Sequence, residues 1–150
     1  MRAHLEVERR FLVREPSVVH GTEGIEIAQV YLFADEHTVL RVGRRHGGWR
    51  LTVKDSGSGV VRREYHTELP EEFGAALFAS PSARRSVKRR YLVPYAGREW
   101  LVDVYRDGPV LAEVELPAAG AELAVPAWCG AEVTGDPAYA DHALARKAAE

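Results

Sequence analysis

Hydrophobic and polar residues alternate along most of this chain, so that apolar side chains recur at every second position. A period of two is typical of β-strands, because successive side chains of a strand point to opposite faces of the sheet. Turns rich in Gly and Asp separate the alternating segments and indicate hairpins between antiparallel neighbours. The pattern predicts eight strands: Ala3–Arg14, Gly24–Phe33, Thr38–Arg45, Trp49–Lys54, Val60–Leu69, Val87–Tyr95, Glu99–Arg106 and Val110–Leu116.

Two segments have the features of short helices. Pro70–Ala79 begins with Pro and two Glu residues, which backbone geometry and the helix dipole favour in a first turn. Near the C-terminus, Asp136 is suited to cap a helix that starts with proline and carries Arg146 and Lys147 in its last turn. The sequence therefore predicts one mainly β domain over residues 1–150, with a few short helices including a C-terminal one.

The composition is that of an ordinary globular protein, with 150 residues, 46% hydrophobic and 28% charged, and a formal net charge of −2. This charge balance argues against a strongly basic nucleic-acid binder. Cys129 is the single cysteine, so the chain cannot form an internal disulfide, which fits a reducing compartment. The N-terminus lacks a signal-peptide pattern, and no stretch approaches the roughly 20 apolar residues of a membrane span. We therefore expect a cytoplasmic protein without a membrane partner.

The polar faces of several predicted strands carry like charges two residues apart. At that spacing, roughly 6.5 Å, two like charges repel by roughly 2.5 kcal/mol at an effective dielectric constant of about 20. In bulk water the repulsion falls to roughly a quarter of that value, so an open surface would tolerate it. The pairs are Glu6 and Glu8, Lys88 and Arg90, and Glu113 and Glu115.

These charged faces have two interpretations. They are either the solvent faces of a sheet packed on one side, as is usual for antiparallel sheets, or they face an enclosed space. Enclosure would require a cation for the glutamates and an anion for the Arg and Lys side chains. A divalent metal ion bound to a polyphosphate meets both needs, because Mg²⁺ binds carboxylate and phosphate oxygens while Arg and Lys clamp the remaining phosphate charge.

The motifs that carry these charges also occur together in a known family. "EVERRF", which starts at Glu6, resembles an ExExK signature, and further motifs follow in the same order and approximate spacing: "LRVGRR", "LTVK", "REY", "VKRRY", "VDVY", "LAEVEL" and "CGAEVTGDPAYADHAL". In this the chain resembles the short bacterial members of the CYTH superfamily, the triphosphate tunnel metalloenzymes. The resemblance implies an eight-stranded antiparallel β-barrel that forms a tunnel. It also implies hydrolysis of inorganic triphosphate, thiamine triphosphate or nucleoside triphosphates, or cyclisation of ATP, with Mg²⁺ or Mn²⁺.

The same resemblance implies roles for individual residues. Carboxylates at the acidic positions would bind metal: Glu6, Glu8, Glu113, Glu115 and Asp103. Cations would hold the substrate, with Arg62 added because it shares their face: Arg10, Arg41, Lys54, Arg62, Lys88 and Arg90. Catalytic roles fall to Glu6, Glu8, Arg10 and Glu64. Asp136 matches a recurrent position at the start of the C-terminal helix.

Three positions depart from the family pattern. The signature lysine is Arg10, whose guanidinium does not lose its proton and therefore cannot act as a base. Gly43 stands where a second arginine often follows; a bulge there would turn Arg44 to the tunnel face, whereas regular pleating would place Arg45 there. His66 stands where an acidic residue is common, and it is either a metal ligand, a proton carrier or, as we prefer, a polar strand residue.

We therefore expect a metal-dependent triphosphatase, with inorganic triphosphate as the substrate. Two alternatives stay open. The start "HLEVE" resembles class IV adenylate cyclases, which would produce cyclic AMP and diphosphate. A module that binds a polyphosphate or phosphorylated ligand without turnover would fit the departures at Arg10 and Gly43. The apolar outer faces of the strands, with few helices to cover them, further indicate a homodimer.

Overall fold

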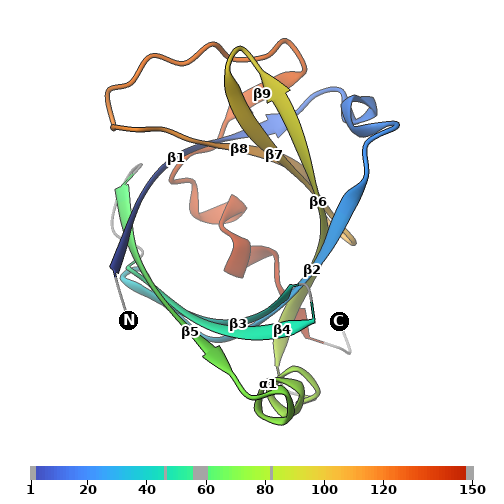
Figure 1. Cartoon of the computed structure of the whole chain (residues 1–150), viewed down its shortest axis with the longest axis vertical. Helices are drawn as coiled ribbons and strands as arrows, with labels where there is room; N and C mark the ends of the chain where they lie inside the picture. Colours follow the sequence, from blue (N-terminus) through green and yellow to red (C-terminus); the bar gives the residue numbers. More distant parts are fainter. Residues whose placement is uncertain (1–2, 46, 56–60, 82, 148–150) are drawn as a thin grey trace.

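The computed structural model describes residues 3–45, 47–55, 61–81 and 83–147, and long β-strands dominate it (Figure 1). These strands match the eight predicted strands in number and order. The predicted start of the fifth strand, Val60, lies outside the described residues. The strands are β1 (Ala3–Val13), β2 (Gly24–Ala34), β3 (Thr38–Arg45), β4 (Gly48–Asp55), β5 (Val61–Leu69), β6 (Arg84–Tyr95), β7 (Arg98–Tyr105) and β8 (Val110–Glu115).

The eight strands form a closed antiparallel barrel. Their order is β6–β2–β3–β4–β5–β1–β8–β7, and the pairing of β7 with β6 completes the circle. Figure 1 shows them as a ring seen end-on. The predicted eight-stranded barrel is thereby confirmed. Because residues alternate between the two faces of each strand, every strand contributes one set of side chains to the barrel interior and another to its outer surface.

The predicted helix Pro70–Ala79 is confirmed as α1, which spans Glu71–Phe78 and lies against the outside of the barrel near β4 (Figure 1). Gly74 allows this close approach, since a Cβ atom at that position would lie 2.2 Å from Cγ of Trp49. The helix thereby covers an apolar cluster on the outer face of β2, β3 and β4. No helix in the described part of the chain is long and apolar enough to cross a membrane.

The C-terminal segment differs from the single helix that its capping pattern predicts. Two short 3₁₀ helices, η2 (Pro137–Tyr139) and η3 (Asp141–Leu144), are separated by Ala140 in an extended conformation. Asp136 does act as a cap, because its side chain accepts a hydrogen bond of 3.0 Å from a backbone amide of η2. The predicted last turn of the helix is wrong, because Arg146 and Lys147 form a short strand, β10 (Arg146–Lys147), that pairs with β6. Pairing with β6 needs extended backbone, so the helix cannot continue.

Two further elements, which the sequence pattern does not predict, lie outside the barrel. They are η1 (Pro16–Val19) and β9 (Cys129–Glu132), the second of which pairs with β1. Together with the long connection between β8 and β9, they cover the outer face of β1, β7 and β8. The buried residues there are Phe11, Trp100, Val102, Ala112, Val114 and Cys129.

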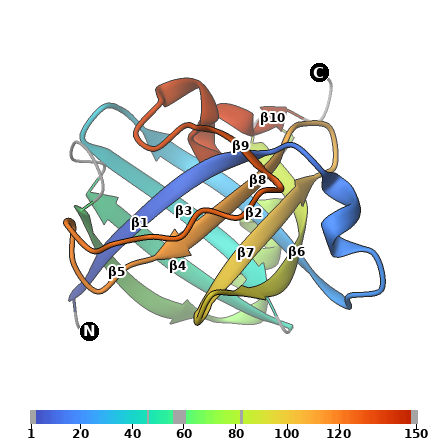
Figure 2. The ribbon, with the colours of Figure 1, turned by 90° about the horizontal axis from the view of Figure 1, so that it is seen from above.

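The inner face of the barrel changes character from one end to the other. At one end, apolar side chains of the strands pack against the C-terminal segment, which lies within the ring in Figure 1 and at one end of the barrel in Figure 2. At the other end the inner side chains are mostly charged. The apolar contacts bring Leu12, Tyr105 and Leu111 against Val133, Tyr139 and Leu144, and Tyr31 and Val39 against Ala145.

Candidate active site

The charged end of the barrel encloses a cavity of about 670 Å³, which we call the front chamber. Inward positions two residues apart on neighbouring strands bring the predicted site residues together on its wall. This confirms the enclosed interpretation of the charged faces over the solvent-exposed one. The predicted residues that line it are Glu6, Arg41, Lys54, Glu64, Lys88, Arg90, Glu113 and Glu115.

A second cavity of about 460 Å³, which we call the rear cavity, adjoins the front chamber along the C-terminal segment. It is lined by the remaining predicted cations and by one predicted carboxylate, namely Arg10, Arg62 and Glu8. Arg41, Lys54 and Asp141 line both cavities and form the partition between them. Of the predicted site residues, Asp103 alone lines neither cavity, and only 1% of it is exposed.

Asp103 on β7 anchors the cations of β6. Arg90, its direct partner across the two strands, donates from Nε and Nη2 to its two oxygens at 2.7 and 2.8 Å, and Lys88 Nζ lies 2.8 Å from Oδ2. Burial alone would raise the pKa of Asp103, but Lys88 and Arg90 hold it below its usual value. Both oxygens are engaged, so the geometry favours a role in orienting Lys88 and Arg90 over the predicted role as a metal ligand.

Lys54 on β4 lies between two glutamates. Its Nζ atom is 2.7 Å from Glu64 Oε1, directly across on β5, and 3.5 Å from Glu6 Oε2 on β1. Burial works against ionisation of Glu64, but the attraction of Lys54 outweighs it and lowers the pKa of Glu64 to about 2. Glu64 is therefore ionised at neutral pH and is a weak proton acceptor. It is better suited to orient Lys54 than to act as a base.

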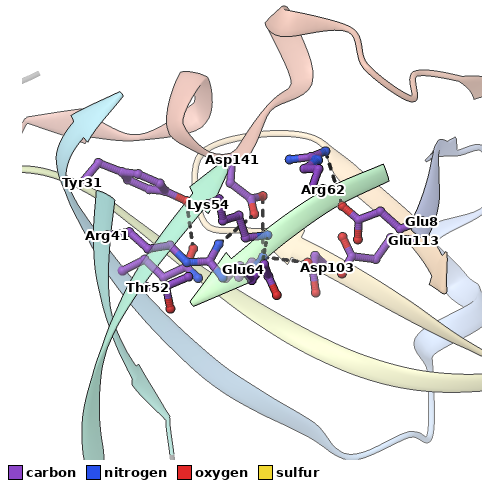
Figure 3. A network of polar contacts seen from close by, with 12 residues as sticks. Glu8, Tyr31, Arg41, Thr52, Lys54, Arg62, Glu64, Asp103, Glu113 and Asp141 are labelled. Atoms are coloured by element: carbon purple, nitrogen blue, oxygen red, sulfur yellow. Dashed lines mark hydrogen bonds and ion pairs between the residues drawn. The ribbon is translucent and has the colours of Figure 1, made fainter. Parts of the chain in front are cut away.

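Three glutamates, Glu6, Glu8 and Glu113, form what we call the acidic corner. Burial, followed by the charge of Glu6, raises the pKa of Glu8 to about 7. Burial also raises the pKa values of Glu6 and Glu113, with neighbouring carboxylates adding to the effect. Figure 3 shows Glu8 beside Glu113, and Arg62 pairs with Glu8 at 3.4 Å. The corner thus brings three buried carboxylates together, each with at least one cation nearby.

The acidic corner fits a divalent cation by its charge, and Glu6 Oε2 is buried without a hydrogen-bond partner. A preformed ligand cage is absent, however. In the described ranges, no group of three Asp, Glu, His or Cys side chains is arranged to hold a metal ion. Glu115 is also a predicted metal ligand. It lies opposite Glu8 in the pairing of β1 with β8, and it lines the front chamber. A metal ion would therefore need oxygens from substrate or water to complete its coordination.

Arg10, which replaces the signature lysine, connects the acidic corner with the C-terminal segment. Its guanidinium donates to the carbonyl oxygen of Tyr139 at 2.8 Å, lies 3.3 Å from Asp141 Oδ1 and approaches Glu113 Oε2 at 3.8 Å. Only 5% of Arg10 is exposed. Each contact uses a different nitrogen of the guanidinium, a spread that the single nitrogen of a lysine does not offer. The departure at this position therefore matches the structure around it.

Gly43 introduces no bulge. The pairing of β3 with β4 is regular there, with Gly43 opposite Arg50 and Arg44 opposite Trp49. Arg44 is exposed, and its guanidinium carbon lies 5.5 Å from the centroid of the Trp49 ring. The predicted bulge is therefore absent, although Arg44 is among the residues that line the front chamber. The side chain of Arg45 lies outside the described part of the structure.

His66 makes hydrogen bonds typical of a polar strand residue. Its Nδ1 atom lies 2.9 Å from Thr52 Oγ1, and its Nε2 atom lies 3.4 Å from Glu64 Oε2. Burial lowers the pKa of His66, so the ring is neutral at pH 7. The contacts support the preferred interpretation of this position and give it no additional positive charge for binding an anion.

Asp141 is the site residue that sequence reasoning missed. It comes from η3 in the C-terminal segment and lies 3.3 Å from Arg10, 3.6 Å from Arg41 and 3.7 Å from Lys88. Tyr105 donates its hydroxyl to the same carboxylate. Figure 3 shows the carboxylate pointing toward Arg41 and Lys54. Burial opposes its ionisation, but the surrounding cations keep the pKa of Asp141 well below its usual value.

Comparison with known proteins places these observations in context. No family model matches the chain. A protein named inorganic triphosphatase from Acetivibrio thermocellus is 34% identical over 148 residues, which cover 94% of this chain and 93% of the relative. A second protein of that name, from Nitrosomonas europaea, is 31% identical and covers 93% of this chain and 96% of the relative. The crystal structure of an inorganic triphosphatase superposes with a TM-score of 0.66 at 29% identity, covering 93% of this chain and 97% of the other.

Proposed function

The chain belongs to the CYTH superfamily, the triphosphate tunnel metalloenzymes, and on that premise we propose that it hydrolyses inorganic triphosphate to diphosphate and phosphate. One observation carries the proposal: inside a closed barrel, a wall of cations faces three glutamates that form the acidic corner. A triphosphate supplies anionic charge to the cations, and a metal ion that it carries supplies positive charge to the corner.

Four cations of the front chamber would hold the substrate: Arg41, Lys54, Lys88 and Arg90. Each of them forms an ion pair with a carboxylate of the chain. Phosphate oxygens would therefore bind to cations whose positions the carboxylates already fix. Because the cations are already oriented, they can neutralise charge that develops on the phosphoryl oxygens in the transition state with little reorganisation.

The acidic corner and Glu115 would hold Mg²⁺ or Mn²⁺ together with substrate oxygens. When bound, such an ion acts as a Lewis acid on phosphoryl oxygens. A carboxylate of the corner, Glu6 or Glu8, would orient or activate the attacking water. The water oxygen then bonds to the terminal phosphorus while the bond from that phosphorus to the diphosphate leaving group breaks.

The test is phosphate release from inorganic triphosphate, thiamine triphosphate and ATP, each with Mg²⁺ and with Mn²⁺. We expect inorganic triphosphate to be turned over fastest, and Glu6→Gln to lower turnover at least about 100-fold. Glu72→Gln on the exposed surface of α1 is the matched control and should leave turnover unchanged. Full activity in Glu6→Gln would contradict the proposed site.

The two alternatives give different products. An adenylate cyclase would convert ATP to cyclic AMP and diphosphate, whereas a binding module would retain triphosphate without releasing phosphate. Both relatives above 30% identity are named inorganic triphosphatases, which favours hydrolysis. The departures that favoured a binding module also carry less weight, because Arg10 keeps a cation next to the acidic corner and Gly43 leaves the strand pairing regular.

The homodimer and the cytoplasmic location stay predictions. Leu5 and Val61, on the outer faces of the paired strands β1 and β5, are 61% and 39% exposed, which supports a contact between copies of the chain. Sedimentation at micromolar concentration would test it: a dimeric mass is expected, and a monomeric mass would count against it.

A further inference from the structure

The partition between the two cavities contains a carboxylate, which is unusual for a site that binds anions. Arg41, Lys54 and Asp141 line both the front chamber and the rear cavity. Cations continue beyond the partition, since Arg10 and Arg62 line the rear cavity. The rear cavity also contains carboxylates, among them Glu8 and Asp136, so its charge is mixed. A chain of phosphates would meet cations on both sides of the partition, and the Asp141 carboxylate lies between them.

Asp141 is held firmly in that position. Three cations lie within 3.7 Å of its oxygens, and the hydroxyl of Tyr105 donates to it. Its own segment is anchored on both sides, because Tyr139 and Leu144 pack around Leu111, and the following residue, Ala145, is fully buried. The carboxylate is therefore a fixed negative charge and cannot swing away as an exposed loop residue could.

Two cations of β6, Arg90 and Lys88, lie between the charged end of the barrel and the Asp141 carboxylate. β10 pairs with the beginning of β6, at Arg84 and Arg85, so that end of β6 lies beside the C-terminal segment. Arg90 lies further from that end than Lys88, and Lys88 contacts Asp141. A polyphosphate that enters from the front would thus reach Arg90, then Lys88, and then a carboxylate that repels its terminal phosphate.

We propose that Asp141 is the positioning residue that ends the substrate track: it stops the terminal phosphate in the front chamber, beside Arg41 and Lys88, and keeps it out of the rear cavity. The inference rests on the proposed function. With the terminal phosphate stopped there, the last bond of the chain would lie in the front chamber, whose wall includes Glu6 and Glu113 of the acidic corner. Hydrolysis then adds water across that bond and releases one orthophosphate at a time.

Linear tetraphosphate tests where the substrate stops, because cleavage of a terminal bond and cleavage of the central bond give different products. Wild-type protein should release orthophosphate and triphosphate first. Asp141→Asn and Asp141→Ser, which remove the charge, should let the chain slide one phosphate deeper, so that diphosphate becomes a substantial early product. Inhibition by added orthophosphate should also become at least about tenfold stronger, because three cations lose their internal partner. Glu36→Gln removes one charge at the exposed rim of the rear cavity and should change neither result.

Several results would overturn the proposal. One is diphosphate as the first product of the wild-type protein, a result that needs no variant. Another is an unchanged product ratio and unchanged phosphate inhibition in both Asp141 variants, provided that they melt cooperatively. If the wild-type protein hydrolyses no polyphosphate at all, the proposed function fails; calorimetric binding of orthophosphate to wild type and Asp141→Asn then tests the inference, and equal affinities would overturn it.

Discussion

The two ends of the barrel interior are built from the same strands and yet have opposite chemistry. We call the end of the barrel that the C-terminal segment fills the closed end. On β8, Leu111 points inward there and packs against that segment, whereas Glu113, two residues further along, belongs to the acidic corner. On β1 the same change occurs between Leu12 and Glu8. On the inner face of one strand, the residues that pack and the residues of the proposed active site therefore occupy different stretches of its length.

This difference has an energetic meaning. Burying a charged carboxylate costs free energy, and burial is the main cause of the raised pKa values in the acidic corner. The closed end offsets this cost with apolar contacts, as do the clusters outside the barrel. Substitutions at the two ends should therefore separate loss of activity from loss of stability.

The largest effect is expected at the charged end. Glu113→Gln keeps an oxygen that can accept from Arg90 Nη2, which lies 3.1 Å from Glu113 Oε1, but it removes the charge that would hold the metal ion. Turnover should fall about 100- to 1,000-fold, the scale of losing one electrostatic contact to a transition state. The thermal midpoint should stay unchanged or rise, because a buried like charge is removed. A large drop in thermal midpoint would show that the two ends are not separable in this way.

The converse experiment uses the same strand. Leu111→Ala removes a side chain that is only 1% exposed, and it should destabilise the protein by about 2–5 kcal/mol. The folded fraction should retain its kcat for triphosphate, because the chamber residues are untouched. Leu92→Ala, at a position that is 44% exposed, is the matched control and should cost less than about 1 kcal/mol. Denaturant unfolding of both variants measures the difference; equal costs would contradict the role given to the closed end.

The sequence predicts the charged end better than the closed end, and the reason is periodicity. Glu6, Glu8, Glu113 and Glu115 share one parity on their strands, so alternation alone places them on one face. Asp141 has no such signal, because it lies in a 3₁₀ helix of four residues. The apolar inward residues Leu12 and Leu111 were the available hint that something fills that end, since an inner face that turns apolar needs a packing partner.

The electrostatic differences among the carboxylates were also beyond sequence reasoning. Glu8 and Glu64 are both glutamates on inward positions, but the pKa of the first is about 7 and that of the second about 2. The difference arises because burial and then the charge of Glu6 raise the pKa of Glu8, whereas Lys54, which lies 2.7 Å from Glu64, outweighs the effect of burial there. Such distances depend on strand register across the barrel, which alternation does not determine.

Arg10 lies at the boundary between the two ends, so its replacement should affect both properties moderately. Arg10→Lys restores the signature residue but leaves one nitrogen for Tyr139, Asp141 and Glu113. We expect a loss of about 1–2 kcal/mol in stability and a raised KM for triphosphate. Arg9→Lys is the neighbouring control, because Arg9 faces outward and pairs with partly exposed Glu132, where an ion pair contributes at most about 1 kcal/mol. If the two variants behave alike, the boundary role of Arg10 is wrong.

The smallest effect is expected at His66, although it lines the front chamber. Its ring contacts Thr52 and Glu64, and burial lowers its pKa, so at pH 7 and above it carries no charge that could attract substrate. His66→Asn should therefore leave KM for triphosphate nearly unchanged at pH 7.5, because an amide can still bond to Thr52. The measurement is KM and kcat from pH 6.5 to 8.5. A large rise in KM, or loss of one ionisation from the pH profile, would contradict this prediction and would show that His66 takes part in substrate binding or catalysis.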